Sequence, residues 1–477
     1  MGCDWISQKL NMSKKYRILK NLLSLAFGHF LVMTAFDSLS NLQSTVNEKE
    51  GIGVASQAII YAFFTLSAFF LPTYLIKRFG CKKTLIISIF SVAPYVAANM
   101  YPCWGTLIPT AMLTGMAYGP YWTARSTYIN ELCYNYSEFS HASISVISAW
   151  FFGIFSFFHE NAEICGNLIS YYVLSNQYVE GEFMNNETQH SSSETKYVYS
   201  GIAYSNEEVK KTNNITNDIS NKTIFQCGAT FCGEIIEVAT NPNLQPPSDA
   251  KWYTLTAIYF TLVIVAALVV IFIVDSLEEK NNESKHPLIL FIATFKQMKN
   301  TNQMLLIPLA FYCGLADGFY NSDFTRAFIA CAWGISQVGY VTICYGVVCA
   351  IMDCSVGSLV KYLRRPTVFI IAAISHFSVF TSLLVWAPGP DNFMLYYALA
   401  GIYGIGASVW WSQITAFYGI IFAENADAAF STFYFWCSLG FTVAFAYSDI
   451  LCTSIKIYTL LGLLFVSVIG YIIVEIR

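Results

Sequence analysis

Long apolar runs alternate with short polar segments along this chain of 477 residues. Many of these runs reach the ~20 residues that an α-helix needs to cross the hydrocarbon core of a bilayer. We therefore predict an all-α membrane protein with about twelve transmembrane helices. The first six cover residues 18–41, 54–77, 84–101, 105–125, 143–175 and 252–275. The second six cover residues 303–324, 336–361, 367–387, 393–415, 427–449 and 453–474.

Two polar segments interrupt this pattern and divide the chain. Residues 176–250 are rich in Asn, Ser, Thr and Glu and connect the fifth predicted helix to the sixth. Residues 276–302 are charged and separate two groups of six helices, which span residues 18–275 and 303–477. A short polar N-terminal segment, residues 1–17, precedes the first helix. We expect residues 276–302 to be a cytosolic linker between two six-helix halves.

Positive charge in the short loops sets the orientation, because loops rich in Lys and Arg stay in the cytosol. The turn after the second helix is strongly basic, with Lys77, Arg78, Lys82 and Lys83. A cytosolic turn here places both termini in the cytosol and residues 176–250 on the opposite side of the membrane. That side suits the three N-glycosylation sequons of the segment. They lie at Asn186, Asn214 and Asn221.

Composition agrees with a chain embedded in lipid and excludes several other classes of protein. Charged residues make up 12% of the chain, about half of the ~25% that is usual in soluble domains. A net charge of −4 gives no reason to expect a nucleic-acid partner. The run from His159 to Glu163 is similar to a zinc-protease helix but lacks its second His. We expect no enzymatic activity, no cofactor and no metal.

The polar segment also contains two cysteines, Cys227 and Cys232. An extracytoplasmic compartment is oxidising, so a local disulfide between these two residues is expected. The alternative is pairing with a cysteine near another outer helix end. The candidates for that pairing are Cys103, Cys165, Cys331 and Cys452.

The fourth predicted helix carries Gly115 and Gly119 before Pro120, and then Trp122 and Arg125. Small residues four apart let two membrane helices approach closely, and Pro favours a kink. The tenth predicted helix repeats the pattern, with glycines between residues 401 and 406 followed by Trp410. We predict that both helices line a central cavity. The alternative is a well-packed structural helix with a polar end.

Ionisable residues in spanning helices are costly to bury and often mark function. His29 is expected near the midplane of the first helix, and Asp37, Glu160 and Asp317 toward the outer ends of their helices. These residues suggest an acid-rich outer vestibule for a cation or for protons. Alternatively, they lie in the headgroup zone or are hydrogen-bonded to neighbours. Arg125 is expected toward the cytosolic end, where it would act with the basic turn.

Two six-helix repeats joined by a cytosolic linker, with basic turns after the second and eighth helices, resemble the major facilitator superfamily. The resemblance implies that Lys77, Arg78, Lys82 and Lys83 form a latch between the cytosolic ends of helices. This chain has Lys77 where the superfamily usually has Asp. Because of this difference, the latch formed by these four residues is a prediction that the structure must test.

Several runs together resemble the uncoordinated-93 family, in particular its A-type members. They include Glu50-Gly-Ile-Gly-Val-Ala-Ser56, Phe70-Leu-Pro-Thr73, Cys165-Gly-Asn-Leu-Ile-Ser170 and Ser322-Asp-Phe-Thr-Arg-Ala-Phe328. The resemblance implies a major-facilitator fold with a role in ion-channel regulation, and two-pore-domain potassium channels as partners. The acids depart from the family pattern, since Asp37 stands where Gly is usual and Cys437 where Glu is usual.

Two functions follow from these expectations. The first is a regulator or accessory subunit of a potassium channel in the plasma membrane, with the endosomal and endoplasmic reticulum membranes as alternatives. The second is a proton- or cation-coupled secondary transporter of a small solute. The family resemblance favours the first, and the acidic residues favour the second.

Overall fold

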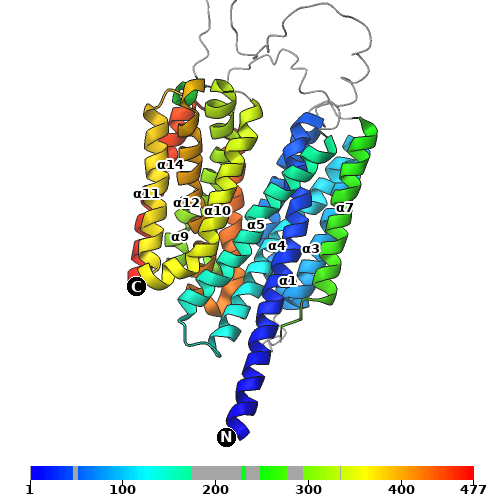
Figure 1. Cartoon of the computed structure of the whole chain (residues 1–477), viewed down its shortest axis with the longest axis vertical. Helices are drawn as coiled ribbons and strands as arrows, with labels where there is room; N and C mark the ends of the chain where they lie inside the picture. The colour runs from blue at the N-terminus through cyan, green and yellow to red at the C-terminus, as the bar shows by residue number, and fades with distance from the viewer. Residues whose placement is uncertain are drawn as a thin grey trace, which may run out of the picture.

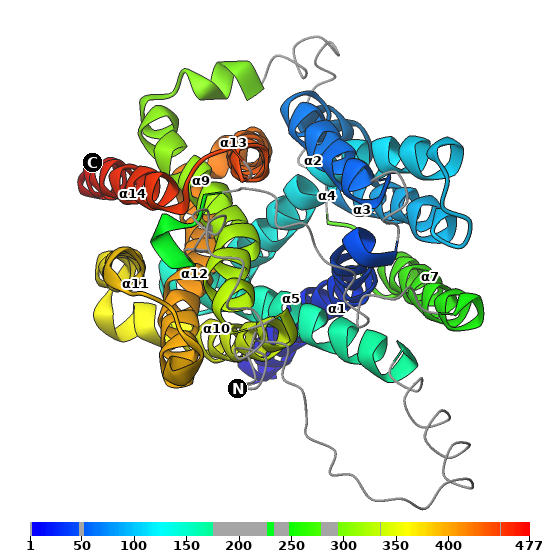
Figure 2. The ribbon, with the colours of Figure 1, turned by 90° about the horizontal axis from the view of Figure 1, so that it is seen from above.

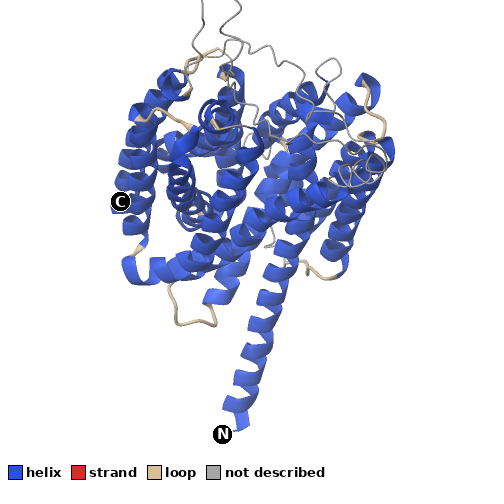
Figure 3. Cartoon of the chain, turned by 45° about the horizontal axis from the view of Figure 1, so that its top comes forward, coloured by secondary structure: helices blue, strands red, loops and turns tan. Residues whose placement is uncertain are grey.

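The computed structural model describes residues 2–46, 52–174, 227–232, 248–277, 294–333, 335–448 and 450–477. All regular secondary structure in these ranges is helical (Figure 3). The first half contains α1 (Gly2–Val46), α2 (Ile52–Phe70), α3 (Pro72–Ala98), α4 (Trp104–Ser137), α5 (Ile144–Leu174) and α7 (Asp249–Phe272). The second contains α9 (Thr301–Phe319), η5 (Tyr320–Ala330), α10 (Ile335–Leu363), α11 (Arg365–Val385), α12 (Phe393–Ile421), α13 (Ala426–Tyr447) and α14 (Thr453–Ile476).

Each predicted spanning segment has its helical counterpart in this series. Backbone hydrogen bonds from Leu71 to Ser67 and from Leu75 to Leu71 carry the helix across the boundary between α2 and α3. The chain then turns at Gly80, whose φ of 79° is accessible mainly to glycine. Eight helices of the described chain are long and apolar enough to cross a membrane on length and composition alone. The structure is therefore that of a multi-pass membrane protein.

The helices pack as two groups that face each other (Figures 1 and 2). In the first group α1 packs on α5 and α7, and α4 on α2 and α3; in the second α9 packs on α13 and α14, and α12 on α10 and α11. The groups meet where α5 contacts α10 and α12, and where α2 and α4 contact α13. Both termini lie at one end of the bundle, opposite the short turn η3 (Gly228–Thr230) (Figure 1).

Gly115 and Gly119 hold α4 against α2. A methyl group built on Gly115 would overlap the backbone oxygen of Ile60, and one built on Gly119 would lie 2.5 Å from the backbone nitrogen of Ala68. This is the close backbone approach that small residues four apart permit. The two glycines thus lie in the contact between α4 and α2, and the structure does not support their assignment to a central cavity.

The expected local disulfide between Cys227 and Cys232 is wrong. Cys227 pairs with Cys331 after η5, and Cys232 pairs with Cys452 before α14. Between the two cysteines, the η3 turn presents each of them to a different neighbour. The backbone oxygen of Phe231 accepts a hydrogen bond from the Thr453 nitrogen at 2.9 Å, which fixes the turn on α14. A segment that connects two helices of the first half is thus bonded covalently to the second half. The sequons at Asn186, Asn214 and Asn221 lie outside the described residues.

Candidate functional site

A buried polar network surrounds His29 of α1, which is only 1% exposed. Its Nδ1 lies 2.7 Å from the hydroxyl of Tyr121 on α4, and its Nε2 lies 3.1 Å from Nη1 of Arg125. An Arg side chain can only donate hydrogen bonds, so Nε2 of His29 must accept. Nδ1 then carries the proton and donates to Tyr121. The geometry therefore favours the neutral form of His29.

Arg125 of α4 lies between two aromatic rings in this network. Its guanidinium carbon is 3.8 Å from the centre of the Trp122 ring and 4.6 Å from that of Phe155 on α5. Such contacts stabilise a desolvated cation through the ring quadrupoles. Nη2 donates to the hydroxyl of Tyr434 at 3.3 Å, and Nε has no hydrogen-bond partner among the described residues. Both hydrogen-bond partners of the guanidinium are thus neutral.

The contact with His29 corrects the expected depth of Arg125. The residue lies at the level of His29 and not with the basic turn. The prediction failed because it used helix boundaries of 105–125, whereas α4 continues to Ser137. Twelve more residues, more than three helical turns, separate Arg125 from the end of the helix.

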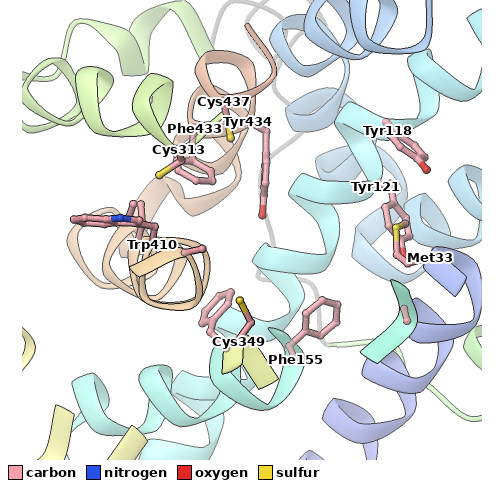
Figure 4. Close-up of a cluster of buried hydrophobic side chains, with 14 of the residues drawn as sticks. Met33, Tyr118, Tyr121, Phe155, Cys313, Cys349, Trp410, Phe433, Tyr434 and Cys437 are labelled. Carbon is pink, nitrogen blue, oxygen red and sulfur yellow. The ribbon is translucent and has the colours of Figure 1, made fainter. Parts of the chain in front are cut away.

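Tyr434 of α13 joins the network to the second half of the molecule. Its hydroxyl lies 2.7 Å from Ser126 Oγ on α4, and its ring centre is 5.7 Å from that of Trp122. Figure 4 shows Tyr434 projecting from α13 toward α4, with Phe155 on the neighbouring α5. Hydrogen bonds from adjacent residues Arg125 and Ser126 converge on this one hydroxyl. The site therefore connects the two six-helix groups at their centre.

Acidic side chains lie around this network without contacting the guanidinium. Asp317 of α9 is half-buried and accepts a 2.7 Å hydrogen bond from Trp411 Nε1 on α12. The ring of Trp411 in turn lies 6.5 Å from that of Trp122. Glu160 of α5 interacts electrostatically with four other carboxyl groups on both halves. They are Asp353, Glu163, Asp317 and Asp37. The acids thus form one group between the halves.

His159, Tyr434 and Trp411 are among the members of the network that were not singled out as site residues by the sequence. His159 Nδ1 lies 3.2 Å from His29 Nε2, and Tyr434 and Trp411 make the contacts given above. The sequence prediction selected Trp410 and not its neighbour Trp411. In the structure Trp410 faces the second half, where its Nε1 donates to His376 Nδ1 at 3.3 Å. A helix places adjacent side chains about 100° apart, so only one of two consecutive tryptophans can face the first half.

The predicted latch residues behave differently from one another. Lys77 of α3 forms a 3.4 Å ion pair with Asp427 in the first turn of α13, and so connects the two halves. Lys82 donates instead to the backbone oxygen of Ile271 at the end of α7, within the first half. Arg78 and Lys83 are exposed. Only Lys77 among the four is positioned as an inter-half latch.

Sequence comparison places the chain among related proteins. The family model described as ion channel regulatory protein UNC-93 matches residues 43–474. Protein unc-93 homolog A of Xenopus laevis is 32% identical over 463 residues, covering 96% of this chain and 93% of the relative. The human protein of that name is 31% identical over 465 residues, with the same coverage. A putative potassium channel regulatory protein of Caenorhabditis elegans is 26% identical, over 97% of this chain and 61% of its own length.

Solved structures with the same fold include FucP, a transporter of the major facilitator superfamily. The transporter FucP in its outward conformation superposes with a TM-score of 0.61 at 12% identity, over 96% of this chain and 99% of its own. A bacterial homologue of the iron transporter ferroportin superposes with a TM-score of 0.59 at 8% identity, over 96% and 99%. At this identity the likeness establishes the fold alone. The expected major-facilitator fold is confirmed.

Proposed function

Because this chain belongs to the UNC-93 family of ion channel regulatory proteins, we propose that it regulates a potassium channel as an accessory subunit in the same membrane. The observation that carries the proposal is the match over residues 43–474, together with the potassium channel regulatory name of the Caenorhabditis elegans relative. Two-pore-domain potassium channels are the partner class we propose to test first.

The central network supports a regulatory role in physical terms. Arg125 is 7% exposed and its polar contacts are with neutral groups, so burying it costs free energy that the contacts must offset. Tyr434 is 1% exposed and comes from the other half. Separation of the halves at this level would break both hydrogen bonds to Tyr434. The network therefore favours one relative arrangement of the halves, and we propose that the channel responds to that arrangement.

We further propose that the protein resides in the plasma membrane with both termini in the cytosol. The basic turn at Lys77 to Lys83 lies at the same end of the bundle as the termini, as this orientation requires (Figure 1). The disulfide-bonded turn η3 lies at the opposite end, where an oxidising compartment permits disulfides. Use of the sequons at Asn186, Asn214 and Asn221 would follow from the same orientation.

The experiment is co-expression with a two-pore-domain potassium channel, followed by whole-cell recording and co-purification. We expect a change in current with the wild-type chain and a loss of most of that change with Tyr434→Phe, which removes the hydroxyl but keeps the ring. Arg78→Gln, at an exposed position, is the matched control and should act as the wild type. Unchanged current together with no co-purification, across the channels of this class, would contradict the proposal.

A flux measurement on the purified protein distinguishes regulation from transport. The half-buried acids between the halves, Asp37, Glu160 and Asp317, are the observation that keeps coupled transport as the second candidate. Purified protein in vesicles, without a channel, should show no solute flux when a proton gradient is applied. Flux that disappears with Asp317→Asn would favour the transporter. An effect on current that needs no flux would favour the regulator.

A further inference from the structure

Asp353 of α10, one of the acids grouped with Glu160, lies where the two halves touch through their backbones. A methyl group built on Gly153 of α5 would lie 2.5 Å from the backbone oxygen of Asp353 and 2.7 Å from Val356 Cγ1. One turn away, a methyl group on Gly357 would lie 3.0 Å from Trp150 Cα. Asp353 itself is only 2% exposed. We call this contact between α5 and α10 the α5–α10 seam.

The Asp353 carboxyl group has little to stabilise a negative charge. Oδ1 accepts a 2.6 Å hydrogen bond from Ser408 Oγ on α12, while the buried Oδ2 has no hydrogen-bond partner in the described part of the chain. The ion pairs found among the described residues do not include Asp353.

The titratable groups near Asp353 also lack positive charge. Glu160 faces it from α5, and Cys349 and Cys354 lie beside it on α10 itself. From α12 the facing groups are the hydroxyls of Ser408 and Ser412. Glu160, when ionised, would repel an ionised Asp353. None of these neighbours can neutralise a carboxylate.

These contacts make the charge state of Asp353 depend on the seam. An unpaired carboxylate in a dry contact costs several kcal/mol even after the surroundings relax. A neutral carboxyl group can instead accept from Ser408 and hold its proton on Oδ2. Ionisation needs water at Oδ2, and Asp353 is only 2% exposed in the closed arrangement. The closed seam therefore requires the neutral acid.

We propose that Asp353 is a proton-binding site whose occupancy is coupled to closure of the α5–α10 seam. A proton from bulk water binds Oδ2 as the seam closes, and it returns to water when the helices separate. Because the closed form binds the proton more tightly, acidification favours closure and alkalinisation favours opening. The site would let the protein respond to pH whether or not a channel is bound.

Infrared spectroscopy of the purified full-length protein tests the protonation directly. At neutral pH we expect a carbonyl band of a protonated carboxylic acid that is lost in Asp353→Asn, an isosteric neutral variant that should fold. Asp391→Asn is the matched control, since Asp391 is exposed and its replacement should leave that band in place. A protonated-acid band that is the same in wild type and Asp353→Asn would overturn the proposal.

Cysteine crosslinking tests the coupling to closure. A Trp150→Cys, Gly357→Cys pair crosses the seam, in a background with Cys349→Ser and Cys354→Ser. A Cβ built on Gly357 lies 3.0 Å from Trp150 Cβ, so a disulfide, which takes about 3.5–4.5 Å between Cβ atoms, needs a small local adjustment. Crosslinking should be compared at each pH with the same pair carrying Asp353→Asn, which corrects for thiol reactivity. We expect the crosslinked fraction of the protein with Asp353, divided by that of the Asp353→Asn protein at the same pH, to fall as pH rises. A ratio that stays constant over the pH range would overturn the coupling.

Discussion

Lys456 of α14 and Asp323 of η5 form a 2.6 Å ion pair in which the two side chains are 2% and 5% exposed. Ser448 completes the arrangement, because its backbone oxygen accepts from Lys456 Nζ at 2.7 Å and its hydroxyl donates to Asp323 at 3.1 Å. Each charge is therefore both paired and hydrogen-bonded. This pair fixes η5 against α14 close to the Cys232–Cys452 disulfide.

Removing one partner of this pair should destabilise the protein strongly. Lys456→Met leaves Asp323 buried without its cation, and such single removals cost about 3–5 kcal/mol. Thermal unfolding of the purified protein in detergent should show a clearly lower midpoint. Lys361→Met, at an exposed position on α10, is the matched control and should change the midpoint little. Equal midpoints for the two variants would show that the buried pair does not stabilise the fold.

The disulfides should hold the two halves together after the linker is cut. A protease site placed within residues 278–293 lets the purified chain be cleaved between the halves. Without reductant the product should run as one band, and reductant should release two fragments. Cys227→Ser alone should leave the halves joined through Cys232 and Cys452, whereas the double variant with Cys232→Ser should separate. Separation of the unreduced wild type is the outcome expected from local Cys227–Cys232 pairing.

A surface ion pair connects Arg17 of α1 to Asp275, three residues after the end of α7, and predicts a pH dependence. The hydrogen bond from Arg17 to Asp275, 2.7 Å long, lowers the pKa of Asp275 from 3.8 to about 2. A carboxyl group with a lowered pKa stabilises the fold above its ordinary pKa, and this stability is lost as pH falls toward 2. Asp275→Asn should therefore cost about 1 kcal/mol or less at pH 7, because the pair is partly exposed. In unfolding experiments the difference from wild type should shrink below pH ~4.

Two Gly→Ala substitutions should have opposite effects on stability. At Gly119 the new methyl group meets the α2 backbone, so α4 must move away, and overpacking of this kind costs ~1–3 kcal/mol. At Gly462 of α14 nothing lies within 4 Å, and the same change should be neutral or stabilising through helix propensity. Unfolding of both variants under identical conditions measures the difference. A Gly119→Ala protein as stable as Gly462→Ala would contradict the close α2–α4 contact.

Helix positions and the fold were predictable because the signals are local. Apolar runs mark the spanning helices, and the Gly115–Gly119 spacing predicted a close contact without its partner helix. The end of α4 was missed because Arg125 to Ser137 is more polar, although every residue from Arg125 to Asn130 is buried. Hydropathy alone does not distinguish such a buried polar stretch from a loop.

The central site was only partly predictable, since it depends on which faces meet. His29 and Trp122 were recognised as polar or aromatic residues in membrane helices. Tyr434 and His159 carry no such signal in a chain rich in aromatic residues, and their roles come from the packing of α13 and α5 against α4. The disulfide pairs likewise depend on where η3 docks, at sequence separations of 104 and 220 residues.

The Lys77–Asp427 pair has a consequence for the electrostatics of α13. The first turn of a helix carries partial positive charge from its unpaired N–H groups, so it attracts acids and repels cations. Lys77 alone would be repelled from this position, and Asp427 in the first turn reverses the local field. An Asp at position 77 would be attracted by the helix directly and would then be repelled by Asp427. An Asp at position 77 is therefore compatible with contact between the two halves at this end only when position 427 carries no negative charge.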